Sequence, residues 1–316
     1  MSSQSNASTM LFGALVADAA SLGVHWIYTP EKLPEIAKQN GGSTAFVPAD
    51  PANYEGIKGY FAHGARPLGA LTQYGEVLRL SIGSILADGS FDVGSYQTRF
   101  AAHFGPGGAY QGYIDRPTRG TLDNIAGEIL SPSGIDDDQL PATATLPAVL
   151  ARYRGGAQEH VRAAQRVTNV NDLAALYGDL FTGLIESIFE GAALEAALKD
   201  AAQSADPEIQ GSLLEALETS ETDSSVYAAV NGRACHLPMA APLIFHILKH
   251  SESFAEAVER NNLSGGDNAG RSILIGALMG LVHGHDPKRG IPLRWALRLK
   301  DGAEIWDDCV ALSKLS

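Results

Sequence analysis

Residues 10–23 have the sequence MLFGALVADAASLG, and this stretch decides the fold. As a helix it is apolar on nearly every face, with Asp18 as the exception. The preceding Ser8 and Thr9 are residues that cap helices well. Because a helix that is apolar all round has to be buried, we predict a central helix that starts after Ser8 or Thr9 and carries one carboxylate.

The composition fits one enzyme-sized domain. The chain has 316 residues, 45% of them hydrophobic and 19% charged, which is enough to build a core without disulfides or metals. Its formal net charge of -13 repels phosphate backbones and anionic lipid. We therefore expect neither a nucleic-acid partner nor a membrane partner.

The cysteines and the N-terminus indicate the compartment. Cys235 and Cys309 form neither a metal-type spacing nor a disulfide scaffold, so we expect reduced thiols. The N-terminal MSSQSNAST has no basic region, and Asp18 interrupts the apolar stretch that follows, which argues against a signal peptide or a membrane span. We predict one cytoplasmic domain over residues 1–316, with residues 1–8 flexible.

Glycine and proline mark two loop regions, 28–69 and 105–120, and helical periodicity fills the rest. The first region is long enough to be functional and has room for at most one short helix, after Thr29. The other expected helices are Thr72 to Gly89, Asp92 to Phe104, and roughly 120–130, 143–154, 157–167, 171–188, 192–203, 207–219, 225–231, 238–249 and 252–262, then NAGRSILIGALMGLVHG and a short IPLRWALRLK helix. No segment has the alternation of a strand, so the predicted fold is all-α.

Three carboxylates are candidate catalytic groups: Asp18, Glu76 and Asp267. Asp18 lies inside an apolar helix, where a carboxylate has to be paired, hydrogen-bonded or neutralised. Glu76, at the start of a helix after the Gly-rich loop, either only favours the helix dipole or acts as a general base. Asp267, in SGGDNAGRS, either caps the next helix or holds a ligand.

Polar residues near these acids are the candidate ligand-binding groups. His25 follows the Asp18 helix, although a lone histidine is more often a packed residue. RPTRGTLDN, residues 116–124, brings cations, hydroxyls and backbone NH groups to a helix N-terminus, which suits a phosphate or carboxylate. Cys235 and His236 are adjacent and therefore point apart, so we expect a packed cysteine there and not a nucleophile pair. The candidate substrate-binding residues are Thr72, Tyr74, His25, Arg116, Arg119, Thr121, Asn268 and Arg271.

Three segments, in this order, resemble the ADP-ribosylglycohydrolase family: GALVADAASLG, TQYGEVLRLSIGSILADGSFD and NLSGGDNAGRSILIGALMGLVHGHDPKRGIPLRW. The match spans nearly the whole chain. The resemblance implies an all-α, single-domain orthogonal multi-helix bundle. It also implies cleavage of N- or O-glycosidic bonds to ADP-ribose, with two magnesium ions held by a TDDT-like and a GGDTDT-like motif.

The sequence departs from the family at both metal motifs. Aligned without gaps, the first motif becomes Thr72-Gln73-Tyr74-Gly75 and the second becomes Asp267-Asn268-Ala269-Gly270. Magnesium prefers oxygen ligands, and these replacements remove most of the negative charge that would draw the ion from water. We therefore predict no metal ligands and favour no cofactor. A two-magnesium site would need other acids, such as Asp115 or Asp223.

The segments YGE, GGDNAGR and ADAASLGVHWIY look more like the subgroup that holds the J-crystallins and selenoprotein J. Our first hypothesis is an ADP-ribosylglycohydrolase-like hydrolase with a degenerate metal site, acting on an ADP-ribosyl or ribosyl-type substrate. In it Glu76 or Asp267 activates water, an arginine near 116–119 holds an anionic group, and Glu76 and Asp267 face one pocket. The alternative is a non-catalytic ligand-binding or crystallin-like structural relative. Both expect a small-molecule or ADP-ribose-like ligand.

Overall fold

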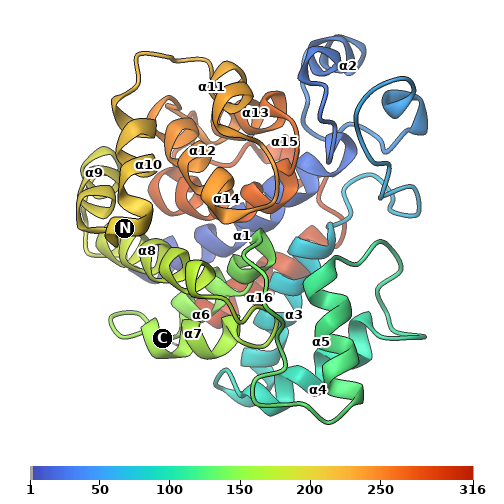
Figure 1. Cartoon of the computed structure of the whole chain (residues 1–316), viewed down its shortest axis with the longest axis vertical. Helices are drawn as coiled ribbons and strands as arrows, with labels where there is room; N and C mark the ends of the chain where they lie inside the picture. The colour runs from blue at the N-terminus through green and yellow to red at the C-terminus, as the bar shows by residue number, and fades with distance from the viewer. Residues whose placement is uncertain (1–2, 316) are drawn as a thin grey trace.

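The computed structural model describes residues 3–315, which form helices and loops and no named β-strand (Figure 1). The all-α prediction is therefore confirmed. Three isolated β-bridges occur in the described residues, one of them between Ile27 and Gly59. The α-helices are α1 (Ser3–Ser21), α2 (Leu33–Gln39), α3 (Gln73–Asp88), α4 (Val93–Phe104), α5 (Arg116–Ala126), α6 (Leu146–Arg152), α7 (Gln158–Gln165), α8 (Asp172–Phe189), α9 (Leu194–Ser204), α10 (Pro207–Glu218), α11 (Ser224–Asn231), α12 (Leu237–Lys249), α13 (Phe254–Ser264), α14 (Asn268–His283), α15 (Leu293–Ala296) and α16 (Gly302–Ser313).

The centre of the molecule is the pair of helices α1 and α14, which pack more extensively than any other two helices of the described chain. Glycines set their separation. A Cβ atom on Gly13 would lie 2.5 Å from the carbonyl oxygen of Gly276, and a Cβ on Gly276 would lie 2.4 Å from that of Gly13. The two backbones can approach this closely only because neither residue has a side chain.

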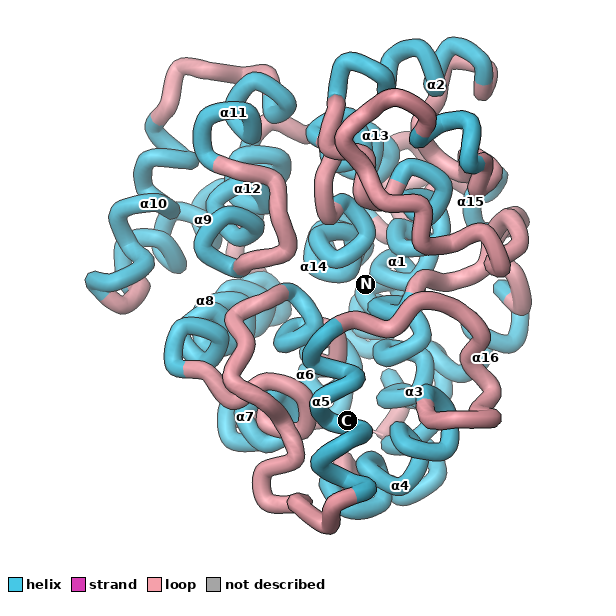
Figure 2. The backbone as a smooth tube through the Cα atoms, turned by 45° about the vertical axis from the view of Figure 1, so that its right-hand side comes forward, coloured by secondary structure: helices cyan, strands magenta, loops and turns pink. Residues whose placement is uncertain are grey.

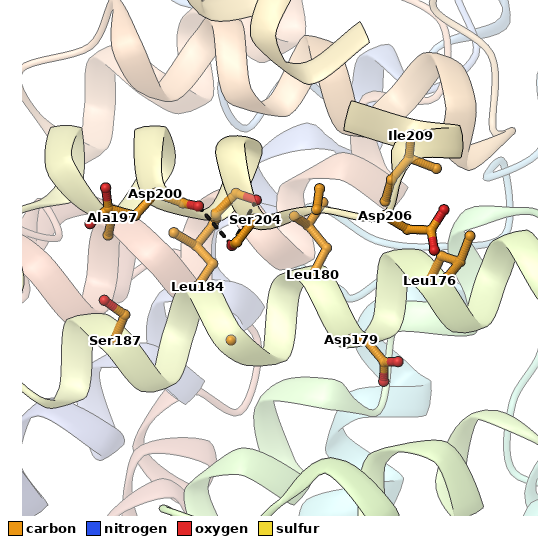
Figure 3. A pocket seen from close by; sticks show the side chains of 13 residues that line it. Leu176, Asp179, Leu180, Leu184, Ser187, Ala197, Asp200, Ser204, Asp206 and Ile209 are labelled. Carbon is orange, nitrogen blue, oxygen red and sulfur yellow. Dashed lines mark hydrogen bonds between the residues drawn. The ribbon is translucent and has the colours of Figure 1, made fainter. Parts of the chain in front are cut away.

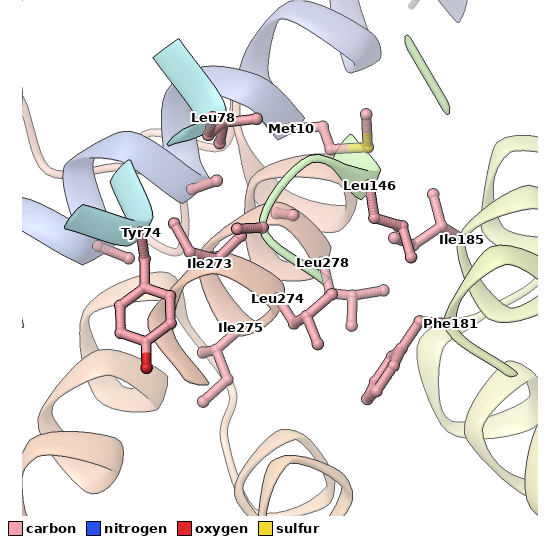
Figure 4. Close-up of a cluster of buried hydrophobic side chains, with 14 of the residues drawn as sticks. Met10, Tyr74, Leu78, Leu146, Phe181, Ile185, Ile273, Leu274, Ile275 and Leu278 are labelled. Atoms are coloured by element: carbon pink, nitrogen blue, oxygen red, sulfur yellow. The ribbon is translucent and has the colours of Figure 1, made fainter. Parts of the chain in front are cut away.

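The hydrophobic core surrounds this pair (Figure 4). Met10 of α1, Leu78 of α3, Leu146 of α6, Phe181 of α8 and Leu278 of α14 are all buried in it. The predicted central helix is thus confirmed. Residues 6–24 are long and apolar enough to cross a bilayer by length and composition, and here the whole stretch is buried inside the fold.

Around the core, helices α8 to α12 cover one side and α3 to α5 with α7 lie below them in the view of Figure 2. The predicted 28–69 loop is confirmed, with α2 as its one α-helix, although three-residue and four-residue 3-10 turns also occur at Pro30–Lys32 and Pro51–Tyr54. Two further 3-10 turns, Leu22–Val24 and Leu140–Thr143, precede loop and helix segments.

Three element boundaries differ from the sequence prediction. Helix α1 begins at Ser3, so Ser8 and Thr9 lie inside it and do not start it. Of the segment 1–8 that we expected to be flexible, residues 1 and 2 lie outside the described residues, and residues 3–8 belong to α1. Helix α5 begins at Arg116, inside the predicted 105–120 loop, because Asp115 caps it. Helix α16 was not predicted: its N-cap, Asp301, has a left-handed φ of 59° and no side-chain capping bond, so the usual start signal is missing.

Candidate functional site

A small cavity lies beside the N-terminus of α3. Its volume is ≈ 10 Å³, about the space that one water molecule needs. The lining side chains come from four separate parts of the chain: His25 and Trp26, His63, Thr72 to Tyr74, and Tyr113 and Asp115. Since most of these residues are buried and polar, their hydrogen bonds decide what the site can do.

Asp267 is the centre of the hydrogen bonding behind the cavity. The His25 Nε2 atom lies 2.8 Å from Oδ1, and the Tyr74 hydroxyl donates to Oδ2 over 2.7 Å. The backbone NH of Gly270 also donates to Oδ1, so Asp267 caps α14 as well as binding two site residues. Burial acts to raise the pKa of Asp267, but the attraction of His25 and these hydrogen bonds lower it below its ordinary value.

His63 extends this cluster into the cavity lining. Its Nε2 lies 2.6 Å from Nδ1 of His25, and the two rings lie edge to edge in nearly parallel planes, 16° apart, with centroids 4.9 Å from each other. Its other nitrogen, Nδ1, is buried and has no hydrogen-bond partner within the described residues. Burial, together with the neighbouring His25, holds the pKa of His63 well below its ordinary value. His63 was missed at the sequence level, because nothing distinguishes it from other polar residues of the 28–69 loop.

The double glycine explains why His25 meets Asp267. Gly265 and Gly266 have φ values of 68° and 67°, a left-handed conformation that favours glycine. Gly266 accepts a hydrogen bond from Trp26 N over 2.9 Å and donates one to Ile27 O over 2.7 Å. These two bonds fix the chain after α1 against the turn that carries Asp267. A Cβ on Gly266 would lie 2.0 Å from the carbonyl oxygen of Arg233, so only glycine fits.

Asp18 lies beneath the start of α3 and is fully buried. It accepts hydrogen bonds from the backbone NH and the hydroxyl of Thr72, at 2.7 and 2.5 Å. Burial raises the pKa of Asp18 to about 7 in spite of these bonds. The carboxylate can approach this closely because residue 75 is glycine: a Cβ there would lie 2.3 Å from Asp18 Oδ2. Asp18 therefore positions Thr72, which lines the cavity and caps α3.

The predicted anion cradle at α5 is already occupied by the protein. Asp115 Oδ1 accepts from the backbone NH of Thr118 over 2.7 Å, and its Oδ2 accepts from Gln73 Nε2 over 2.8 Å. Arg116 pairs with Asp137, with 2.7 Å between Nη1 and Oδ2, and Arg119 donates to the carbonyl oxygen of Ile114. The hydroxyl of Thr121 donates to Val167 O over 3.1 Å. Asp115, which directly precedes the predicted cradle 116–124, lines the cavity, and residues 116–124 do not.

Glu76 belongs to a second cluster. It forms an ion pair with Arg66, and its Oε2 lies 3.1 Å from Nε2 of His103. Burial acts to raise the pKa of Glu76, but the His103 hydrogen bond and the Arg66 guanidinium lower it overall. Glu76 and Asp267 thus have different partners, and neither is among the residues that line the cavity. The prediction that Glu76 and Asp267 face one pocket is not supported at this cavity, because neither side chain lines it.

Asn268 and Arg271 join helices and do not reach the cavity lining. Asn268 Nδ2 donates to Ser21 O over 3.1 Å and to Asn262 Oδ1 over 2.8 Å. Arg271 is fully buried and donates to four groups: Asn261 Oδ1, Asn261 O, Gly265 O and Arg233 O, at 2.8, 3.4, 2.6 and 3.1 Å. Burial lowers the pKa of Arg271 to about 10.

The residues of the two motif segments do not fit a two-magnesium centre. Within residues 3–315, no three or more His, Cys, Asp or Glu side chains form a group that could hold a metal ion. Both oxygens of Asp267 accept hydrogen bonds, and both ends of the Gln73 amide are bonded to Asp115. Of the spare acids, Asp223 caps α11, and Asp115 caps α5. Hydrogen-bond donors surround these carboxylates where a magnesium site would need oxygen ligands.

The Cys235–His236 pair is placed as expected. Burial raises the pKa of Cys235 to about 12, so its thiol stays protonated. His236 Nδ1 lies 2.6 Å from Asp138 Oδ1. The two side chains serve different contacts.

A larger hollow lies far from these residues in the fold, between α8 and the helices α9 and α10 (Figure 3). Its volume is ≈ 480 Å³. Its apolar lining includes Leu176, Leu180 and Leu184 of α8. Three aspartates, Asp179, Asp200 and Asp206, also line it. Asp179 pairs with Arg162 at 2.6 Å, and Asp206 caps α10.

Comparisons with known proteins agree on the type of fold. The ADP-ribosylglycohydrolase family model matches residues 1–316. The chain is similar to crystallin J1A of Tripedalia cystophora, with 26% identity over 98% of this chain and 96% of that protein. Crystallin J1B of the same organism is also 26% identical, over 95% and 93% of the two chains. Among solved structures, an ADP-ribosylglycohydrolase-related protein complex covers 99% of both chains with a TM-score of 0.74 and 18% identity.

Proposed function

Because this chain belongs to the ADP-ribosylglycohydrolase family, we propose that it hydrolyses an N- or O-glycosidic bond of a ribosyl-type or ADP-ribosyl substrate without a two-magnesium centre. In this proposal the cavity beside α3, which has room for one water molecule, is where the attacking water is activated. Hydrolysis of such a bond passes through an oxocarbenium-like state that a nearby carboxylate stabilises. Asp115 is the carboxylate in the cavity lining, and Asp267 supports the lining from behind.

One observation supports the proposal most strongly. The Tyr74 hydroxyl donates a hydrogen bond to Asp267 Oδ2 over 2.7 Å, and the two residues are 193 positions apart in the sequence. The segments that would hold magnesium in the family still meet, but they meet through a direct hydrogen bond. Hydrogen bonds from a hydroxyl, an imidazole and a backbone NH stabilise the Asp267 carboxylate, a role that metal ions would otherwise have. This arrangement supports a site at the family's position in the fold in which hydrogen bonds, and not metal ions, stabilise the Asp267 carboxylate.

The test is a turnover assay on the purified full chain with an N-ribosyl and an O-ADP-ribosyl substrate, in magnesium and in excess EDTA. We expect release of free ribose or ADP-ribose in both buffers. Asp267→Asn should lower kcat by at least about 10²-fold, since the cluster that it orients loses its anion. Asp200→Asn, on an exposed helix surface remote in the fold, is the matched control and should keep wild-type turnover. Turnover that disappears in EDTA would refute the metal-free part of the proposal.

A second candidate function is a ligand-binding or structural protein without turnover. Two observations favour it: the cavity of ≈ 10 Å³ is too small for a ribosyl group in this conformation, and two relatives are named crystallins. Thermal-shift titrations with ADP-ribose, with and without magnesium, separate the two functions. A higher Tm with ADP-ribose and no product from any riboside would favour binding alone.

A further inference from the structure

His25 and His63 form a chain of hydrogen bonds that begins at Asp267 and ends at an unpartnered nitrogen, His63 Nδ1. Asp267 Oδ1, His25 and His63 follow one another at 2.8 and 2.6 Å, and His63 lines the cavity. All three side chains are at most 3% exposed. A buried polar atom without a partner is uncommon and calls for a physical explanation.

The direction of this chain follows from the carboxylate. An ionised Asp267 can only accept, so His25 Nε2 carries the proton that it donates to Asp267. In neutral His25 the other nitrogen, Nδ1, is then a bare acceptor. His63 Nε2 must donate to it, which leaves the Nδ1 of neutral His63 without a proton. The order of donors thus turns His63 Nδ1 into a proton acceptor.

We propose that His63 is the general base of the site, and that it takes a proton from the attacking water at Nδ1 while its Nε2 proton passes to Nδ1 of His25. This inference rests on the proposed hydrolysis and names the residue that activates the water. The balance is complete. Water loses one proton to His63, its oxygen bonds to the anomeric carbon, and the glycosidic electron pair leaves with the aglycone. The extra proton on His25 Nδ1 then returns to His63 Nε2, and His63 Nδ1 releases the proton that it took from water, so that both histidines regain their starting tautomers and the aglycone gains one proton through solvent.

The relay explains how a deeply buried histidine serves as a base. A positive charge left on His63 would be poorly solvated. After the second proton transfer the charge lies on His25, directly against the Asp267 carboxylate at 2.8 Å. His25 and Asp267 act as positioning residues, because they fix the tautomer of His63 and stabilise the charge that it passes on.

The decisive experiment reads the tautomers by two-bond ¹H–¹⁵N NMR of the full chain at neutral pH, independently of any substrate. We expect an unprotonated Nδ1 on His63 in the wild type. In Asp267→Asn the side-chain amide can donate to His25 Nε2, which reverses the chain and moves the His63 proton to Nδ1. The exposed His160, stacked on Tyr153, is the internal control and should not change. A protonated Nδ1 on His63 in the wild type overturns the inference.

Turnover provides the second arm. His63→Gln should lower kcat about 10²–10⁴-fold, and His63→Ala should regain activity on addition of imidazole. His160→Asn should keep wild-type turnover. Activity that His63→Gln leaves unchanged would overturn the role of His63 and leave the proposed hydrolysis intact. Wild-type protein that cleaves no riboside contradicts the proposed hydrolysis, while the tautomer measurement still decides whether His63 is a proton acceptor. If His63→Gln fails to fold, the Asp267→Asn measurement decides alone.

Discussion

The cavity beside α3 and the larger hollow between α8, α9 and α10, called the groove below, differ in the chemistry of the side chains that line them. This difference does not follow from their volumes. The groove measures ≈ 480 Å³ and the cavity ≈ 10 Å³. In the groove, Asp179 forms a partly exposed ion pair and Asp206 caps a helix, which are structural roles. The cavity gathers buried titratable groups from four parts of the chain. Convergence of buried polar groups is therefore a better guide to chemistry here than volume.

The largest difference between the two regions should appear in the pH dependence of stability. The pKa of Asp18 is about 7 in the folded protein, well above the ordinary aspartate pKa of 3.8 expected in the unfolded chain, so between these two pH values the folded state holds a proton that the unfolded state has lost. This contribution to stability is therefore greatest at low pH and decreases as the pH rises toward 7. We expect it to weaken folding by about 2 to 3 kcal/mol between about pH 5 and pH 8.

Asp18→Asn should remove this contribution and raise stability most at alkaline pH, measured by urea unfolding at several pH values. The amide oxygen can still accept from the Thr72 backbone NH. Asp200→Asn, in the groove, should keep the pH dependence of the wild type. An unchanged slope in Asp18→Asn would show that Asp18 titrates normally.

Gly75 and Gly183, which both lie inside helices, should differ in how a Gly→Ala substitution changes stability, for a steric reason. We expect this effect to be smaller than the pH dependence. In Gly75→Ala the new Cβ would lie 2.3 Å from the Asp18 carboxylate, so we expect a loss of about 1–3 kcal/mol from overpacking. Gly183 lines the groove, and a Cβ there meets nothing within 4 Å. Gly183→Ala should be neutral or stabilise α8 by up to about 1 kcal/mol. Equal Tm values for the two variants would contradict the tight packing at residue 75.

The smallest expected contrast is between two ion pairs. Arg66 and Glu76 are each 13% exposed, whereas Arg162 and Asp179 are 45% and 25% exposed. Double-mutant cycles with Ala should give a coupling energy of about 0.5–3 kcal/mol for the less exposed pair, Arg66–Glu76, and about 0.2–1 kcal/mol for the more exposed pair, Arg162–Asp179. High salt should reduce the coupling energy of Arg162–Asp179 more than that of Arg66–Glu76. A larger coupling at Arg162–Asp179 would reverse the comparison.

The helices and the central position of α1 could be predicted because they depend on local periodicity. The same holds for the helices expected to start near Thr72 and Asp92, and in the structure both of these side chains accept capping hydrogen bonds. The start of α1 was misplaced, since Ser8 and Thr9 are acceptable inside a helix as well as before one. Helix α16 was missed because the backbone at Asp301 gives no capping signal.

The site was only partly predictable. Asp18, Thr72, Tyr74, His25 and Asp267 were selected from the sequence, and the structure joins them by hydrogen bonds in two groups, one at Asp18 and one at Asp267. His63 could not be selected, because its place depends on how the 28–69 loop folds back. That loop is held by the Ile27–Gly59 bridge and by the bond from Tyr60 N to Trp26 O, which link residues more than thirty positions apart.

The pairing of α1 with α14 also has a consequence for synthesis on the ribosome. The helix made first has its most extensive contacts with a helix that begins at residue 268. At about 5–20 residues per second, the ribosome needs roughly 10 to 50 s to make the intervening chain. During that interval an apolar segment of 19 residues lacks its most extensive partner. The contacts of α1 with α3 and α6 can form earlier, so we expect them to shield part of this segment until α14 has been made.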